Sequence, residues 1–444
     1  MRDNEMVTLA EQRVTVRGHY DVVVCGGGPA GIGAAVAAGR GGARTLLVES
    51  QCHVGGMATS VPLSRFCDSH GGPVFDEMVH RLMQMGAAEY VQNPRRYRPP
   101  GRIAYRAESV KAVALKMIAE AGVDVLLGTT AESAWLADEA VAGVLVANKG
   151  GRSLMKSRVV VDATADADIA ASGGARFLKG DPEDGRLQHV AFRLAISNVD
   201  AERYEREKPS DEEIIELLRA AQEDGLLHPP AGVFRLEPEI FPFDRRSGRL
   251  ALGGWEIQGV DPTDPVAVSK TLVECQLAAL ELVQLCRAHL PGYEDCEIGA
   301  FPAALGTRES RRVVGQYLLT GEDVVGASKF DDAVAKAWFW IDLHDPSPGK
   351  STPYSLEYVQ AHRPPEGDWY EIPYRCLVPE ELRGLLVAGR CVSCDRRAQG
   401  SLRIMPTCMF IGTAAGTAAA MAVAQGLLPH ELDGTEVGAA ILGA

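Results

Sequence analysis

The sequence is short of positive charge. Its 444 residues include 45 lysines and arginines against 59 aspartates and glutamates, a formal net charge of −14. An acidic surface repels phosphate backbones, so we predict no nucleic-acid partner. A nucleotide ligand is still compatible with this charge, because backbone N–H groups can hold a single pyrophosphate.

The N-terminal segment lacks the apolar stretch of a signal peptide, since residues Met1 to His19 are polar and of mixed charge. The ten cysteines are mostly scattered, unlike those of a secreted disulfide scaffold. We therefore predict a cytoplasmic protein whose thiols are mostly reduced.

Long hydrophobic runs are also scarce. One uncharged segment is long enough to be either a membrane-spanning helix or an internal helix of a globular protein. Ile404 to Pro429 contains no charged residue, and Gly412 and Gly416 have the spacing of a helix-dimer motif of membranes. The segment consists mostly of Ala, Gly and Thr, which gain little from contact with lipid. We predict a tightly packed internal helix and no membrane partner.

The beginning of the chain has the pattern of a βαβ unit. The apolar run Asp21 to Cys25 predicts a buried strand, Pro29 to Gly39 an Ala-rich helix with Pro in its first turn, and Arg44 to Glu49 a second strand. This order predicts a parallel sheet.

The rest of the chain suggests two domains. Short β-rich runs at Val123–Leu127, Val141–Ala147 and Arg158–Val161 indicate a meander, and Leu385–Ala388 indicates another strand near the C-terminus. The middle third contains charged helices, among them Asp211 to Glu223 and Pro265 to His289. We predict an α/β fold in which residues 1–186 and 371–444 form a Rossmann-like domain, a parallel sheet plus a β-meander. Residues 187–370 form an inserted α+β substrate or cap domain.

The glycines between the first strand and helix match G-x-G-x-x-G at Gly26, Gly28 and Gly31. In this motif the first glycine makes a tight turn, the second lets a pyrophosphate approach the backbone, and the third lets helix and strand pack closely. Glu49, at the end of the second strand, can accept hydrogen bonds from ribose hydroxyls, which favours FAD or NAD over NADP.

FAD fits better than NAD. The stretch Gly55 to Thr59 follows the second strand, where the ribityl chain and ring of a flavin would lie, and a second G-x-G-x-x-G is not found. The sequence also has no H-E-x-x-H and no G-x-S-x-G. We therefore predict FAD as the cofactor, no metal site and no hydrolase.

Several stretches resemble the FAD-dependent oxidoreductases of the glutathione-reductase-like flavoprotein fold, and within them a widespread bacterial branch. The narrower matches are the Glu-Ser-Arg-Arg and Met-Pro-Thr-Cys segments. The matching stretches are residues 21–49, 55–59, 159–168, 305–312, 317–320, 370–379, 385–390 and 403–420.

The resemblance implies that residues 162–165 lie near the pyrophosphate or adenosine of FAD and that Gly389 and Arg390 close over its ribityl phosphate. It also implies that a helix beginning near Pro406 points its N-terminus at the flavin ring, where its partial positive charge can stabilise the reduced flavin. Ala165 and Ala167 stand where that family usually has glycines. The predicted cofactor-binding residues are Gly26, Gly28, Pro29, Ala30, Gly31, Glu49, Ser50, Gly55, Gly56, Met57, Thr59, Ala131, Ala163, Thr164, Gly389, Arg390, Met405 and Thr407.

Cysteine and histidine leave alternatives open. Cys391 and Cys394 form a C-x-x-C that is either a dithiol relay to the flavin or two partly buried thiols, and the second interpretation is favoured. Cys52 and His53 are either covalent attachment sites for the flavin or residues that merely lie nearby, and again the second is favoured.

Arginines are the main catalytic candidates, because an arginine near the ring can hold a substrate carboxylate or stabilise a reduced flavin. We predict Arg403, Arg311 and Tyr374 as catalytic residues, with Arg375 as a further residue of the cleft. The alternative for Arg311 and Arg312 is structural, with Glu309 pairing to an arginine and tying the domains together.

Together these features predict an FAD-dependent oxidoreductase, a dehydrogenase or oxidase, that transfers a hydride between a small organic substrate and flavin N5. The alternatives are a flavin-containing lyase or isomerase with redox-neutral turnover and a non-catalytic flavin or thiol redox sensor. The electron acceptor and a homo-oligomeric state stay open.

Overall fold

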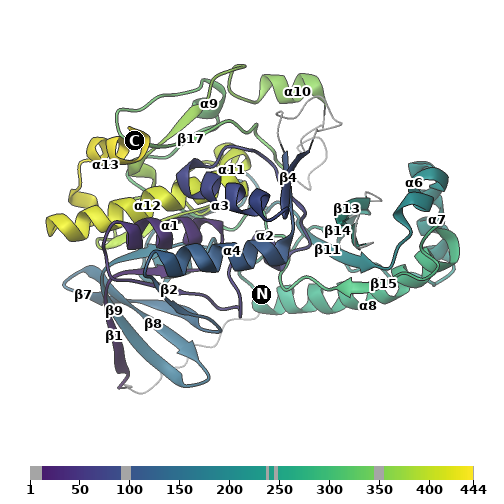
Figure 1. The fold of residues 1–444 in the computed structure, drawn as a ribbon, viewed down its shortest axis with the longest axis horizontal. Coiled ribbons are helices and arrows are strands. Elements are labelled where there is room, and N and C mark those ends of the chain that lie inside the picture. Colours follow the sequence, from purple (N-terminus) through teal and green to yellow (C-terminus); the bar gives the residue numbers. More distant parts are fainter. Residues whose placement is uncertain (1–12, 92–101, 237–239, 245–248, 345–354, 444) are drawn as a thin grey trace.

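The computed structural model describes residues 13–91, 102–236, 240–244, 249–344 and 355–443. Figure 1 shows a larger body at the left, which contains both termini of the described chain, and a smaller body that extends to the right. Most of the N-terminal segment 1–19, in which the sequence predicts no signal peptide, lies outside the described residues.

A seven-stranded sheet organises the larger body. The strand order is β6-β2-β1-β9-β8-β7, and β19 pairs with β9. Pairs β1–β2, β1–β9, β2–β6 and β9–β19 are parallel, whereas β7–β8 and β8–β9 are antiparallel. The strands are β1 (Thr15–Cys25), β2 (Thr45–Val48), β6 (Asp124–Leu126), β7 (Thr130–Ala137), β8 (Ala140–Asn148), β9 (Gly151–Asp162) and β19 (Leu385–Val387).

This sheet confirms the predicted Rossmann-like α/β fold with a meander, with one correction. The run Val123–Leu127, predicted as part of the meander, forms β6, which is a parallel strand beside β2. The reason is the helix α4 (Ala107–Glu120), which precedes β6 and carries the chain back across the sheet, so that the next strand runs in the same direction.

The uncharged segment is a buried helix, as predicted. Helix α12 (Met405–Gln425) is long and apolar enough to cross a membrane, but 78% of its most apolar window is buried inside the protein. It crosses α1 (Pro29–Arg40) with the backbones in close contact, and the two helices lie side by side in Figure 1. A Cβ atom on Gly412 would be 1.9 Å from the carbonyl oxygen of Ala30, and one on Gly416 would be 2.1 Å from that of Ala34. Small residues are therefore required at this helix crossing.

A small sheet and two helices complete one wall beside α1. The sheet has the order β3-β5-β4 and is antiparallel. Its elements and neighbours are α2 (Met57–Ser60), β3 (Arg65–Phe66), α3 (Gly72–Gln84), β4 (Ala88–Val91) and β5 (Arg102–Tyr105).

The smaller body has its own hydrophobic core, built from residues between Val190 and Leu305. An antiparallel sheet of order β12-β14-β11-β15, with β13 on β14, packs near three helices. Two of them, α7 (Asp211–Glu223) and α8 (Pro265–His289), have the predicted bounds. The remaining elements are β11 (Val190–Ser197), α6 (Ala201–Glu207), β12 (Val233–Leu236), β13 (Ile240–Asp244), β14 (Arg249–Ile257) and β15 (Glu297–Ala300).

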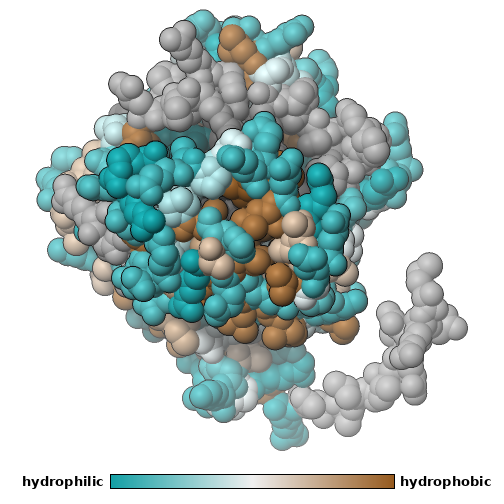
Figure 2. Space-filling view, turned by 90° about the vertical axis from the view of Figure 1, so that its right-hand side faces the viewer, coloured by the Kyte–Doolittle hydropathy of each residue, from teal (hydrophilic) through white to brown (hydrophobic). Residues whose placement is uncertain are grey.

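The chain then returns to the larger body, since residues such as Val313, Val334 and Ile341 pack in the larger core. From the side of the smaller body the described surface is mostly hydrophilic, with hydrophobic residues gathered near its middle and lower edge (Figure 2). The other elements are α5 (Asp168–Ser172), β10 (Phe177–Lys179), β16 (Arg311–Val313), α9 (Gly321–Val325), β17 (Ala333–Ala337), α10 (Leu356–Ala361), β18 (Tyr370–Pro373), α11 (Arg396–Leu402) and α13 (Gly434–Leu442), with 3-10 turns at Tyr374–Cys376 and Pro429–Glu431.

Candidate active site

A cavity of about 1030 Å³ runs between the two bodies. One end is lined by the turn after β1, the start of α1 and the end of β2. The other end is lined by residues of the smaller body, including Val268 and Leu272 of α8 and the loop from Ala303 to Arg308. The cavity therefore joins the predicted nucleotide fingerprint to the predicted substrate segment.

The glycine turn has the geometry that close packing requires. Gly26 has a φ of +98°. A Cβ atom on Gly31 would be 1.7 Å from the carbonyl oxygen of Gly26, so any side chain there would separate α1 from the turn. Gly28 differs, because among the described residues a Cβ atom on it would meet only the Cα of Gly56, at 3.8 Å. The space in front of Gly28 is thus left for a ligand.

Helix α1 begins at this space without a competing side chain. In the described part of the chain no side chain caps its N-terminus, which follows Gly28. Uncapped N–H groups and the helix dipole together make a binding site for an anion such as a pyrophosphate. The residues present therefore fit a dinucleotide.

Glu49 is fixed at the end of β2, where it lines the cavity. One carboxylate oxygen, Oε2, accepts a hydrogen bond of 2.6 Å from the N–H of Gly27, and Oε1 accepts one of 2.8 Å from the N–H of Gln51. The carboxylate can still accept from a ribose, because its two oxygens offer about four lone pairs.

The loop after β9 is held by a buried carboxylate. Asp162 accepts hydrogen bonds from the N–H of Thr164 at 3.1 Å and of Ala170 at 2.9 Å. Ala165 and Ala167, the two departures from the family pattern, have φ angles of +71° and +57°. Both are left-handed, where glycine is favoured and a Cβ atom is strained.

Because of this strain, we predict that a change from alanine to glycine stabilises the protein at these two positions and destabilises it in a helix. We expect Ala165→Gly and Ala167→Gly each to raise the free energy of unfolding by roughly 0.5 kcal/mol, because strain relief slightly exceeds the added entropy of the unfolded chain. The control is Ala171→Gly in α5, which should lower it by about 1 kcal/mol because its conformation is helical. Urea unfolding of the three variants measures both effects, and a loss of stability in all three would contradict the prediction.

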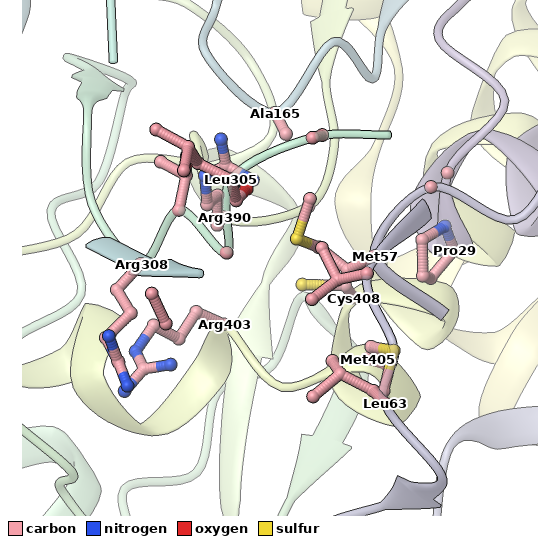
Figure 3. Close-up of a pocket in the computed structure, with 18 of the residues that line it drawn as sticks. Pro29, Met57, Leu63, Ala165, Leu305, Arg308, Arg390, Arg403, Met405 and Cys408 are labelled. Carbon is pink, nitrogen blue, oxygen red and sulfur yellow. Dashed lines mark hydrogen bonds between the residues drawn. The ribbon is translucent and has the colours of Figure 1, made fainter. Parts of the chain in front are cut away.

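Two further elements, which the resemblance implied to lie near FAD, line the cavity. Gly389, with a φ of +92°, and Arg390 line it, and Arg390 Nη2 donates to Asp166 Oδ1 at 2.6 Å. The start of α12 lines it through Met405 and Cys408. Figure 3 shows the side chains of Met57, Met405 and Cys408 gathered at one side of the cavity and those of Arg308 and Arg403 at another.

A cluster of charged side chains lies at the substrate end. Arg308 Nη2 donates to Glu256 Oε1 at 2.7 Å, and Arg403 Nη2 donates to the carbonyl oxygen of Asp342 at 2.9 Å. Between them, His344 places Nε2 3.2 Å from Asp342 Oδ1 and Nδ1 3.7 Å from Glu256 Oε1. All five residues line the cavity.

Burial and charge set the protonation states of this cluster. Burial, with the positive charge of Arg308, lowers the pKa of His344 to about 4, so its imidazole is neutral at pH 7. Burial alone would raise the pKa of Glu256, but Arg308 and the two histidines hold it below its usual range. Burial alone would also raise the pKa of Asp342, but His344 and Arg403 hold it below its usual range. The site thus contains two cations, two anions and a neutral base.

His189 adds a second imidazole, with Nε2 2.8 Å from Glu256 Oε2. Ligand atoms of His189, Glu256 and His344 lie within 4.8 Å of one another, a spacing that could also suit a metal ion. Arg308 already donates to Glu256, which places a fixed cation beside this carboxylate. We therefore interpret the cluster as a hydrogen-bonded network.

Most of the predicted cofactor residues come together here. Those that line the cavity are Gly26, Gly28, Pro29, Ala30, Glu49, Ser50, Gly56, Met57, Ala131, Ala163, Thr164, Gly389, Arg390 and Met405. Gly31, Gly55, Thr59 and Thr407 are not among the described residues that line it, and Thr59 Oγ1 donates to the carbonyl oxygen of Val54 at 3.0 Å.

Of the three predicted catalytic residues, the fold brings only Arg403 into this cavity. Tyr374 lies in the 3-10 turn Tyr374–Cys376, is buried, and donates from its hydroxyl to the carbonyl oxygen of Pro429 at 2.7 Å. Arg311 is not among the described residues that line the cavity, but its Nη1 donates to Oδ1 of Asp168, which does line it, at 2.9 Å. Arg375, the further candidate of the cleft, pairs with Asp332 at 2.9 Å.

Glu309 pairs with arginines, as the structural alternative for its segment predicted. It is fully buried, accepts from Arg312 Nη1 at 2.6 Å and also accepts from Arg396 Nε at 3.1 Å. Arg396 belongs to α11 of the larger body. The Glu-Ser-Arg-Arg segment thus links distant parts of the chain.

The two cysteines of the C-x-x-C are not among the described residues that line the cavity. Cys391 and Cys394 are fully buried, and burial raises the pKa of both. A buried thiol with a raised pKa is a poor nucleophile, which fits the favoured interpretation of two structural cysteines. Neither Cys52 nor His53 is among the described residues that line the cavity.

Glu256, Asp342, His344 and Arg308 were not predicted from the sequence. Arg308 directly precedes the Glu-Ser-Arg-Arg segment, so its position within a recognised stretch was a usable signal. The other three stand alone in the sequence, without a motif around them.

The comparisons with known proteins agree with the geometry of the cavity. The family described as FAD dependent oxidoreductase matches residues 21–441. No curated protein matches the chain.

Three solved structures are among those to which this chain has a low similarity. A geranylgeranyl bacteriochlorophyll reductase-like protein from Thermoplasma acidophilum is 14% identical, with a TM-score of 0.45, over 92% of this chain and 80% of that one. p-Nitrophenol 4-monooxygenase PnpA from Pseudomonas putida DLL-E4 is 12% identical, with a TM-score of 0.47, over 96% and 83%. A triple mutant of the flavin-dependent brominase Bmp2 is 14% identical, with a TM-score of 0.45, over 96% and 84%.

Because the family match extends over nearly the whole chain, from the first βαβ unit to the last helix, this protein belongs to the FAD dependent oxidoreductase family and its cofactor is FAD.

Proposed function

We propose that this protein transfers a hydride between a small organic acid and N5 of FAD, as a dehydrogenase or oxidase. The continuous cavity carries the proposal, because it joins the anion-binding start of α1 to a cluster of arginines. We also propose that the chain belongs to the glutathione-reductase-like branch of flavoproteins, on the strength of the stretches quoted above.

In this proposal the pyrophosphate of FAD binds at the N-terminus of α1, in front of Gly28, and the ribose lies against Glu49. Arg390 and the loop at Ala163 and Thr164 border the middle of the cofactor. When bound, FAD supplies the two-electron redox chemistry, and the protein supplies position and charge. The N-terminus of α12 lies at the same cavity through Met405 and favours negative charge near it.

The substrate side takes residues from the segment 187–370, which the sequence predicted as the substrate domain, although the later part of this segment, with Val313, Val334 and Ile341, packs in the core of the larger body. Arg308 contributes from this segment, and Arg403 comes from the larger body. A guanidinium has five N–H groups, and the two contacts of Arg308 to the carbonyl oxygen of His189 and to Glu256 leave donors for a ligand. Two such groups at one end of a partly apolar cavity favour a carboxylate on the substrate.

Neither alternative function gains comparable support. A thiol redox sensor needs accessible cysteines of low pKa, and Cys391 and Cys394 are buried with raised pKa values. A redox-neutral lyase or isomerase would use the same cavity without net reduction of the flavin, which the following experiment distinguishes.

The test begins with the absorbance spectrum of the purified protein before and after acid precipitation. Flavin colour in the supernatant indicates non-covalent FAD, whereas colour in the pellet would revive Cys52 or His53 as attachment sites. The holoprotein is then mixed anaerobically with small carboxylic acids, and bleaching of the flavin band reports hydride transfer. Turnover without bleaching, and without need of an electron acceptor, would support the lyase or isomerase instead.

Arg403→Lys and Arg308→Lys test the carboxylate contact. We expect each to weaken binding of the acid that bleaches the flavin by about tenfold or more, because lysine cannot form a bidentate contact. Arg176→Lys is the control, since Arg176 is an exposed arginine that pairs with Glu381 on the surface. Unchanged binding in both cavity variants would contradict the proposed role of the arginines.

A further inference from the structure

The neutral imidazole at the substrate end is a group that the proposed function has not yet used. His344 lines the cavity together with both arginines. Its backbone is fixed on two sides: the N–H donates to Gln188 Oε1 at 3.0 Å, and the carbonyl oxygen accepts from the N–H of His189 at 3.2 Å. The backbone of His344 is therefore held at two points at the edge of the cavity.

The neighbours of the ring assign a role to each nitrogen. Nε2 lies 3.2 Å and 3.3 Å from the two carboxylate oxygens of Asp342, so the single proton of the neutral ring is placed on Nε2 and donated to that carboxylate. Nδ1 then carries the lone pair and can accept a proton. A carboxylate that orients an imidazole in this way is a recurring arrangement for general bases.

A proton taken up at Nδ1 would also be stabilised. Glu256 Oε1 lies 3.7 Å from Nδ1, so the imidazolium would stand between two carboxylates. Among the described residues, the groups around His344 include Asp342 and Arg403 on one side, Glu256 and Arg308 on the other, and the ring of His189 at 5.2 Å between centroids. The base is therefore neutral at rest and has acceptors ready for its charged form.

We infer that His344, oriented by Asp342, is the catalytic base that accepts the hydroxyl proton of an alcohol, so that the substrate class of this cavity is a hydroxy acid. The inference rests on the proposed function. In the step, the O–H bond breaks and its proton goes to His344 Nδ1, while the C–H bond of the same carbon breaks and its electron pair leaves as hydride to N5 of FAD. A C=O bond forms, so the substrate loses two electrons and FAD, the oxidant, gains them.

The kinetic test compares matched acids and matched variants. The anaerobic probes are the hydroxy acids glycolate, lactate, malate and mandelate, with alanine, aspartate, propionate and succinate as counterparts that lack the hydroxyl. A hydroxy acid is expected to bleach the flavin, and His344→Gln to slow this bleaching by 10²–10⁴-fold, the usual contribution of a general base. Asp342→Asn should slow it less, since it removes only the orienting partner.

His228→Gln is the control, because His228 also pairs with a glutamate, Nδ1 to Glu281 Oε1 at 3.0 Å, but its side chain is 71% exposed on the surface. It is expected to leave the rate unchanged. Equal rates in wild type and His344→Gln, or faster bleaching by acids without a hydroxyl, would overturn the inference while the proposed function stands. If no acid bleaches or perturbs the flavin, the proposed function fails as well.

A second readout does not depend on turnover. In protein labelled at the histidine rings, the NMR signal lost in His344→Gln identifies His344, and it should not titrate between pH 5.5 and 8. Because the folded pKa lies below that of a free histidine, Arg308→Gln should raise it toward 6.5 by removing a nearby cation. A wild-type signal that titrates near pH 6.5 would overturn the neutral base.

Discussion

Replacing Gly412 by alanine should lower the free energy of unfolding by about 3 kcal/mol, because the added methyl group overpacks a helix crossing. Its Cβ atom would be 1.9 Å from the carbonyl oxygen of Ala30, which is backbone and cannot rotate away. Gly416→Ala meets Ala34 in the same way, and its Cβ atom would be 2.1 Å from that carbonyl oxygen. Both helices would have to separate to accept either change.

The sign of this effect separates tertiary packing from local preference. By helix propensity alone, alanine in place of glycine inside α12 should stabilise the protein by about 1 kcal/mol. Urea unfolding of the FAD-loaded protein, followed by circular dichroism, measures the difference. Gly150→Ala is the control, since in the described part of the chain its Cβ atom would meet only the side-chain oxygen of Asn148, at 3.1 Å. A gain in stability for Gly412→Ala would show that α1 and α12 do not cross as closely as described.

Gly28→Val should abolish FAD binding while the apoprotein stays folded. Gly28 has φ and ψ of −73° and −173°, which any residue can adopt, and its Cβ atom would point into the open space before α1. A valine there occupies the place proposed for the pyrophosphate, so we expect FAD affinity to fall at least roughly 100-fold. The poorer N-cap should cost no more than about 1 kcal/mol of stability.

The measurement is the flavin content after dialysis, together with thermal unfolding of apoprotein. Gly31→Ala provides the contrast, because its Cβ atom would be 1.7 Å from the carbonyl oxygen of Gly26 and should disturb the fold itself. Normal FAD content in Gly28→Val would mean that the cofactor does not lie in front of this residue.

The residues that bind the cofactor could be predicted from local patterns in the sequence. The first βαβ unit lies within about thirty residues, so its glycines, helix and acid are neighbours in sequence as well as in space, and the motif could be read directly. The long helices Asp211–Glu223 and Pro265–His289 were equally readable, since capping residues and periodicity are local signals. The uncharged C-terminal segment was identified as an internal helix because its small side chains suit close packing.

The substrate side was decided by tertiary structure. Glu256, Arg308, His344 and Arg403 come from four separate parts of the chain, and only the packing of the smaller body against the larger one brings them to one cavity. The fold also pairs the hydroxyl of Tyr374 with the carbonyl oxygen of Pro429, and it pairs Arg311 with Asp168, so that neither predicted catalytic side chain lines that cavity. The sequence around a charged side chain does not indicate which distant residue will pair with it. The sequence by itself therefore determined that this chain binds FAD, and the fold decided which residues face the substrate, because contacts between distant segments exist only once the chain is folded.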